Sequence, residues 1–249
     1  MTLAAIDIGS NAARLLITEV SLNEHDEPVF NKKNLVRVPL RLGFDVFEFG
    51  YITQERIDML IQTMKAYRHL LNAYQVDAIK VCATSAMRDA DNAKDVLNQV
   101  RRETGLDIEV ISGEMEANLV YENHIAENLD KEHSYLYIDV GGGSTEISFF
   151  TNGRLALKKS FNIGTIRLLK QKVSDKEWDE MKDSIKQATR GQKGETAIWK
   201  RNISKSVFSE QEKLTSHNPQ VTRNCIMSWM PCHSKSASPG MACAATGPM

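Results

Sequence analysis

The sequence is poor in several features that define major classes of protein. Cys82 is the only cysteine in the first 190 residues, which excludes a disulfide framework there. No stretch approaches the roughly 20 apolar residues that a transmembrane helix needs. The formal net charge of −1 leaves no basic surface of the kind that nucleic-acid-binding proteins carry. We therefore expect a soluble globular protein with neither a membrane nor a nucleic acid as partner.

A targeting signal is also missing from the N-terminus. Residues 1–3 run directly into an apolar strand, without the charged region or small-residue cleavage site of a signal peptide. Hydrophobic residues make up 42% of the chain and charged residues 25%, which is ordinary for a globular protein. A chain of 249 residues can bury one full core or two modest ones. We expect a cytoplasmic location.

Two matched glycine turns are the most informative feature of the chain. Residues 5–11 and 138–145 each combine an apolar strand, an Asp (Asp7 or Asp139) and a tight glycine turn with hydroxyl or amide side chains. Glycine at the tip of a β-hairpin lets backbone N–H groups approach an anion, because no Cβ is in the way. Two ordinary hairpins are the competing interpretation. The matched Asp positions favour two hairpins that face each other and clamp a phosphate chain, with both Asp available to a metal ion.

The order of the expected elements indicates the fold class. The chain twice shows the same pattern, in which hairpin strands are followed by alternating strands and helices. This pattern predicts two similar α/β domains with mixed sheets, flanking helices and a cleft between them. Thr53 can cap a long amphipathic helix, whereas the Phe- and Gly-rich segment 43–51 is expected to be a loop. We place the first domain at residues 1–126 and the start of the second at 127–190.

Residues 83–90 follow a buried-type strand and end in an arginine that could bind phosphate. Strand ends of this kind are where α/β sheets place ligands. Arg88 offers a planar fork of donors that suits phosphate oxygens. The alternative is that Arg88 forms a surface ion pair with Asp89 or Asp91, and the residues alone leave both interpretations open.

Residues 111–119 place two acids at the start of a helix. Acidic side chains in a first helical turn usually complement the helix dipole. The alternative is that one of them, Glu114 or Glu116, points into the cleft as a base that activates water. Because side chains two positions apart on a helix point in different directions, at most one of them can serve.

Together these segments resemble the exopolyphosphatase / guanosine pentaphosphate phosphohydrolase family, a branch of the actin–Hsp70–sugar kinase fold. The resemblance runs from residue 3 to about residue 190 and rests on residues 83–90, 111–117, 138–146 and 162–168. It implies two ribonuclease H-like (actin-like ATPase) domains, the second of which is incomplete in this chain.

The resemblance also implies roles for individual residues. Glu116 aligns with the general base, and Arg88 with an arginine that contacts phosphate. The chain departs from the family at Met115, where a Glu is usual. Asp139 and Glu146 align with acidic groups near the magnesium ion and the attacking water, and Asp7 completes the expected Mg²⁺ ligands. The expected phosphate-binding residues are Ser10 and Asn11 in the first loop and Gly141, Gly142, Gly143, Ser144 and Thr145 in the second.

The implied activity is Mg²⁺-dependent hydrolysis of a phosphoanhydride, which releases the terminal phosphate of inorganic polyphosphate or of guanosine pentaphosphate. A homodimer would be usual for the family. One alternative is a nucleotide-binding kinase or ATPase of the same superfamily, although the late Gly-Gly segment that would bind adenosine is absent from the sequence. Another alternative is an inactive, truncated fragment that only binds phosphate.

Residues 191–249 differ in character from the rest of the chain. Apolar periodicity stops after Gly191, and three of the four cysteines and four of the six prolines lie beyond residue 218. The Cys and His residues there match no standard zinc-ligand spacing. Our hypothesis is a reading-frame change between Gly191 and Trp199, which would leave an atypical and mostly disordered tail.

Overall fold

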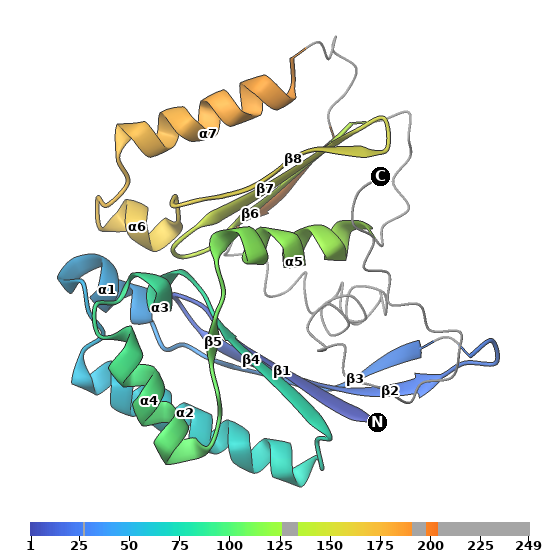
Figure 1. Ribbon diagram of the computed structural model, residues 1–249, viewed down its shortest axis with the longest axis vertical. Coiled ribbons are helices and arrows are strands. Elements are labelled where there is room, and N and C mark those ends of the chain that lie inside the picture. Colours follow the sequence, from blue (N-terminus) through green and yellow to red (C-terminus); the bar gives the residue numbers. More distant parts are fainter. Residues whose placement is uncertain (27, 126–133, 191–197, 204–249) are drawn as a thin grey trace.

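The computed structural model describes residues 1–26, 28–125, 134–190 and 198–203. They form two β-sheets with helices around them (Figure 1). The elements of the first domain are β1 (Thr2–Ile8), β2 (Ala13–Leu22), β3 (Pro28–Val38), α1 (Leu42–Phe49), α2 (Gln54–Ala73), β4 (Ala78–Ala83), α3 (Ser85–Asp89), α4 (Ala93–Thr104) and β5 (Glu109–Val110). Those that follow are α5 (Gly113–Ile125), β6 (Tyr135–Val140), β7 (Thr145–Thr151), β8 (Arg154–Phe161), α6 (Thr165–Leu169), α7 (Asp175–Ala188) and β9 (Ile198–Ile203).

The two sheets repeat one strand order. The first sheet runs β3-β2-β1-β4-β5 and the second runs β8-β7-β6-β9. In the first sheet, β1 pairs antiparallel with β2 and parallel with β4. In the second sheet, β6 pairs antiparallel with β7 and parallel with β9. The second sheet therefore repeats the first four positions of the first sheet, and the described residues contain no fifth strand for it. The prediction of two similar mixed α/β domains, the second incomplete, is confirmed.

The core of the first domain lies under one face of its sheet, where α2 and α4 pack (Figure 1). The apolar positions of α2 recur every three or four residues, so they form one stripe that faces the sheet. Leu60, Met64 and Tyr67 on this stripe are fully buried against strand residues such as Ile6 and Leu15. The buried Tyr67 hydroxyl donates to the carbonyl of Ala13 at 3.0 Å and lies 3.3 Å from that of Val36.

The core of the second domain is smaller. It consists of Leu136, Ile147, Phe149, Phe161 and Ile163, and side chains of α7 pack against it. Helix α7 begins with a capping box, in which the Ser174 and Glu177 side chains each bind the other's backbone N–H. This cap fixes where the helix begins.

The segment 43–51 is helical rather than a loop. Arg41 begins α1 with a positive φ of 58°, and Gly50 ends it with a φ of 86°. Val46 and Phe47 are buried on the helix side that faces the core. The richness in Phe and Gly therefore reflects a short helix packed close to its neighbours.

Two further details differ from the sequence analysis. Helix α5 packs against β8 and β7 of the second sheet, although the boundary at residue 126 assigned it to the first domain. Residues 198–203, which fall in the segment expected to be disordered, form β9 beside β6. The open edge of β6 explains this pairing, because its unpaired N–H and C=O groups favour an added strand. The remainder of 191–249 lies outside the described residues. None of the described helices is both long and apolar enough to span a membrane.

Replacing Tyr67 by Phe should destabilise the first domain by about 1–2 kcal/mol, because a buried carbonyl loses its donor. Burial raises the pKa of Tyr67 to about 12, so the unfolded chain ionises this phenol before the folded chain does. The stability that the hydroxyl contributes is therefore present below pH 10 and lost as the pH rises towards 12. Urea unfolding at pH 7 and pH 11 measures both effects. Tyr51→Phe, at an exposed ring, is the control and should change neither value.

Candidate active site

The two glycine turns meet at the boundary between the domains. In the first domain the Oγ atoms of Ser10 and Ser85 are buried and lie 2.7 Å apart. The second turn rests directly on this pair. A Cβ on Gly142 would lie 3.2 Å from Ser10 Cβ, and one on Gly143 would lie 2.7 Å from Ser85 Cβ. Only glycine permits this approach, and the structure thus brings the two predicted phosphate loops together.

The first loop is fixed by the start of α1. The N–H of Gly43 donates to Ser10 O and the N–H of Arg41 donates to Asn11 O, each at 2.8 Å. A Cβ on Gly43 would lie 2.8 Å from Ser10 Cβ, so glycine is needed for this contact as well. The Asn11 side chain is exposed at the tip of the loop, whereas Ser10 is buried.

The second loop is fixed in the same way by the start of α6. Three successive loop carbonyls accept hydrogen bonds from this helix: Gly141 O from Thr165 N–H (2.9 Å), Gly142 O from Ile166 N–H (2.8 Å) and Gly143 O from Arg167 Nε (2.6 Å). Every peptide bond described is trans, so the N–H of each linkage points away from its carbonyl. The N–H groups of residues 142–144 therefore face away from α6 as a group, an arrangement that binds anions.

Glu116 and Arg88 form a partly buried ion pair at the start of α5. Glu116 Oε2 lies 3.0 Å from Arg88 Nη1, which also donates to Ile111 O at 2.8 Å, and both side chains are 19% exposed. Burial raises the pKa of Glu116, while the charge of Arg88 opposes this shift. Arg88 thus pairs with Glu116 rather than with Asp89 or Asp91, and its binding of phosphate stays a prediction. Glu114, by contrast, is exposed.

Glu146 is a buried carboxyl group of the site with a raised pKa. Its side chain is buried and accepts a hydrogen bond from Ser160 Oγ at 2.8 Å. Burial is the main cause that raises its pKa to about 8, and the charge of Glu116 adds to the effect. Glu146 therefore holds its proton to a higher pH than a free carboxyl group does. Asp139 lies opposite it across β6 and β7.

The position of the first sheet that corresponds to Glu146 holds a basic residue, Arg14, instead of an acidic one. Asp7 lies opposite Arg14 in the same register, and the two form an ion pair at 3.1 Å. The two domains thus share one backbone plan but differ in charge at one position, where the first has Arg14 and the second has Glu146.

The predicted Mg²⁺ ligands are carboxylates, the oxygen donors that this ion prefers. The charges of Asp7 and Asp139 both act on Glu116, so these side chains face the same region. Among the described residues, however, no three acidic, His or Cys side chains gather closely enough to hold a metal by themselves. The donors fit a Mg²⁺ bound through one or two carboxylates, with water and substrate phosphates as its other ligands.

One predicted residue has a protein partner, and other site residues were missed. The Thr145 hydroxyl donates to the Ile163 carbonyl, and its binding of phosphate stays a prediction. Ser85, Ser160 and Arg167 contact the site but were not predicted. Ser85 and Arg167 lie within the segments 83–90 and 162–168 that carried the family resemblance, so the sequence could have identified them as candidate site residues. Nothing in the sequence around Ser160 singles it out.

The duplicated sheet order and the two facing glycine loops define a two-domain α/β protein of the actin-like ATPase fold. The sequence profile of the Ppx/GppA phosphatase family matches residues 24–213. This match covers most of the chain, which therefore belongs to that family. The match extends beyond Gly191, so the family-like part of the chain continues past the predicted break.

Individual relatives agree with this assignment. The chain is 34% identical over 170 residues to a bifunctional 3-dehydroquinate synthase/phosphatase of Fusobacterium nucleatum, a match that covers 66% of this chain and 25% of that protein. It is 31% identical over 182 residues to exopolyphosphatase 1 of Mycobacterium bovis, covering 70% and 50%. The chain thus spans half or less of the length of these relatives.

Two solved structures share the fold. An exopolyphosphatase from Cytophaga hutchinsonii superposes with a TM-score of 0.70 at 24% identity, over 90% of this chain and 78% of that one. The Ppx/GppA family member of Aquifex aeolicus superposes with a TM-score of 0.61 at 27% identity, over 89% and 72%.

Replacing Gly164 by Ala should separate α6 from the second loop. A Cβ there would lie 2.5 Å from the backbone carbonyl carbon of Gly142, and a backbone atom cannot swing aside. We expect a loss of about 2 kcal/mol or more in the free energy of unfolding, measured in urea. Gly9→Ala is the matched control, because a Cβ there meets nothing closer than 3.6 Å. Equal losses in both variants would contradict the steric argument.

Proposed function

We propose that this protein hydrolyses phosphoanhydride bonds and releases the terminal phosphate of inorganic polyphosphate. The observation that carries the proposal is the Glu116–Arg88 pair, which lies where two glycine loops converge. A base beside an anion-binding arginine is what attack by water on a terminal phosphoryl group requires. Membership of the Ppx/GppA phosphatase family supports the same chemistry.

In the proposed reaction Glu116 is the general base. Burial raises the basicity of its carboxylate, and Arg88 favours the ionised form, so the group can accept a proton at neutral pH. The water oxygen forms a bond to the terminal phosphorus as its proton passes to Glu116. The bond from that phosphorus to the bridging oxygen breaks, and the shortened polyphosphate leaves with the electron pair.

Charge neutralisation provides the rest of the proposed catalysis. Arg88 and the N–H groups of residues 142–144 would bind the oxygens of the terminal phosphoryl group. Asp7 and Asp139, with Glu146 once it has lost its proton, would hold Mg²⁺. When bound, this ion neutralises phosphate charge and orients the chain. Burial raises the pKa of both Asp7 and Glu146, so we expect Mg²⁺ to compete with protons for these two carboxyl groups.

Guanosine pentaphosphate is a second candidate substrate, because it carries the same type of terminal phosphoanhydride. We also propose a cytoplasmic setting and a homodimer, in line with the sequence analysis. A superfamily kinase or ATPase is the weaker alternative, since it gives no role to the buried Glu116. A further alternative is an inactive fragment that only binds phosphate, because the chain spans only part of the length of its relatives.

Glu116→Gln should reduce phosphate release from long-chain polyphosphate about 10²- to 10⁴-fold, the usual contribution of a general base. The measurement is inorganic phosphate production in the presence of Mg²⁺, with guanosine pentaphosphate tested in parallel. Glu114→Gln is the matched control, since Glu114 is exposed on the same helical turn and should leave the rate unchanged.

The possible outcomes separate the alternatives. Full activity of Glu116→Gln would show that another group is the base. If the folded wild-type chain releases no phosphate from either substrate, the chain is an inactive fragment. Turnover of ATP alone would favour the kinase or ATPase interpretation.

Removing divalent cations should abolish phosphate release, and adding Mg²⁺ should restore it. The reason is that the described carboxylates lie beside the expected phosphate position and would repel a polyanion without a cation between them. The measurement is the rate of release after chelation with EDTA and during titration with Mg²⁺. Activity that persists in EDTA would contradict the proposed metal.

A further inference from the structure

Arg167 belongs to the second domain, but its guanidinium group lies against the first. The side chain is 11% exposed. Its Nε donates to Gly143 O at 2.6 Å, and its Nη2 forms an ion pair with Asp89. The guanidinium carbon lies 4.2 Å from the centre of the Phe47 ring, within the range of a cation–π contact.

These contacts join three parts of the candidate site. Gly143 is in the second phosphate loop, and Asp89 directly follows Arg88 on α3. Phe47 is a buried residue of α1, the helix whose start fixes the first loop. Arg167 therefore contacts the second phosphate loop itself, the helix that carries Arg88, and the helix that fixes the first phosphate loop.

The bond to Gly143 O has a direct geometric effect. A planar trans peptide fixes the N–H of Ser144 opposite the Gly143 carbonyl, so holding the carbonyl also aims that N–H. Hydrogen bonds from a charged donor are stronger than neutral ones, and this one is largely shielded from water. The Gly141 and Gly142 carbonyls accept from backbone N–H groups, and Gly141 O also accepts from the Thr165 hydroxyl at 3.3 Å. Among the described residues, Arg167 is therefore the one charged donor to the three loop carbonyls.

We propose that Arg167 is a positioning residue that holds the second phosphate loop against α3, so that the loop N–H groups and Arg88 act on the same phosphoryl group. This inference rests on the proposed function for its kinetic consequence. Its structural consequence, the order of the loop, can be measured without substrate.

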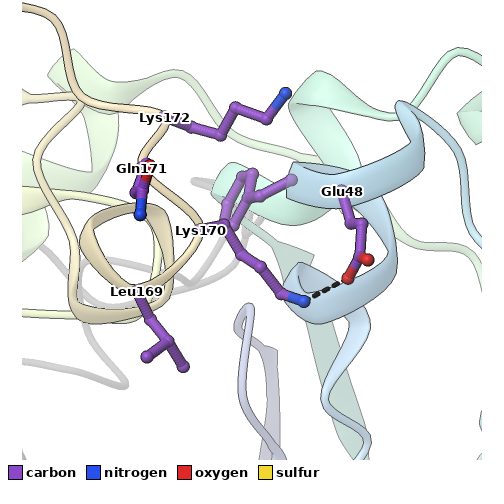
Figure 2. A pocket seen from close by; sticks show the side chains of 6 residues that line it. Glu48, Leu169, Lys170, Gln171 and Lys172 are labelled. Carbon is purple, nitrogen blue, oxygen red and sulfur yellow. Dashed lines mark hydrogen bonds and ion pairs between the residues drawn. The ribbon is translucent and has the colours of Figure 1, made fainter.

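Lys170, which directly follows α6, provides a matched comparison. Its Nζ forms an ion pair with Glu48 on α1 and lies 5.8 Å from the centre of the Phe44 ring. Figure 2 shows this pair beside a pocket of about 310 Å³. Lys170 thus resembles Arg167 in charge and in the domain that its side chain contacts. It differs because, among the described residues, its Nζ pairs with Glu48 on α1 and not with the glycine loop.

The first test is hydrogen–deuterium exchange of the purified full chain without substrate. Arg167→Lys keeps the charge but removes the Nε donor and the planar guanidinium. We expect exchange of the Thr165 and Ile166 amides, which donate to loop carbonyls, to increase at least tenfold, while those of the β1 and β2 core stay protected. Lys170→Ala should leave exchange at Thr165 and Ile166 unchanged. Unchanged exchange in Arg167→Lys, or an equal increase in Lys170→Ala, would overturn the proposal.

The second test is steady-state kinetics with tripolyphosphate. Arg167→Lys should raise KM and lower kcat/KM about tenfold or more, and Lys170→Ala should match the wild type. A purely structural loss would instead reduce the amount of active protein, which lowers the apparent kcat at an unchanged KM. If the wild type shows no hydrolysis, the proposed function fails, while the exchange experiment still decides the role of Arg167.

Discussion

The structure of the candidate site depends on how the carbonyl groups of its glycine loops are bound. In both domains a helix start donates N–H groups to these carbonyls, α1 for the first loop and α6 for the second. Without these bonds a glycine-rich turn could adopt many conformations, because glycine is the residue least restricted in φ. With them, the peptide planes are fixed and the loop N–H groups are oriented before any ligand arrives. A binding site that is already ordered loses less conformational entropy when it binds.

This shared backbone supports two different sets of side chains. The strand pair of the first domain carries Asp7 and Arg14, whose charges cancel. The strand pair of the second domain carries Asp139 and Glu146, two acidic side chains opposite each other, and burial raises the pKa of Glu146. The two domains thus share a strand order but differ in the charge of this side-chain pair.

The sequence predicted the parts of this arrangement that follow from local patterns. Alternating strands and helices, and the glycine turns with their Asp residues, were sufficient for the fold and for both loops. Helix α1 was missed because its Gly43, a poor helix former, is present for contact with Ser10 rather than for a turn. Ser160 could not be found, because its role arises only from the pairing of β8 with β7. The partner of Arg88 also required the structure, since Glu116 approaches it from a helix 28 positions along the chain.

The raised pKa values of the buried carboxyl groups have a consequence for how the site would meet a charged ligand. Burial raises the pKa of Asp7, Glu116 and Glu146, so each favours its neutral form more than a free carboxyl group does. Each negative charge repels a polyanion, so its local concentration near the site is higher when fewer of these groups are ionised. Association would therefore slow as the pH rises and the carboxyl groups ionise. The difference would shrink in high salt, because mobile ions screen the same field.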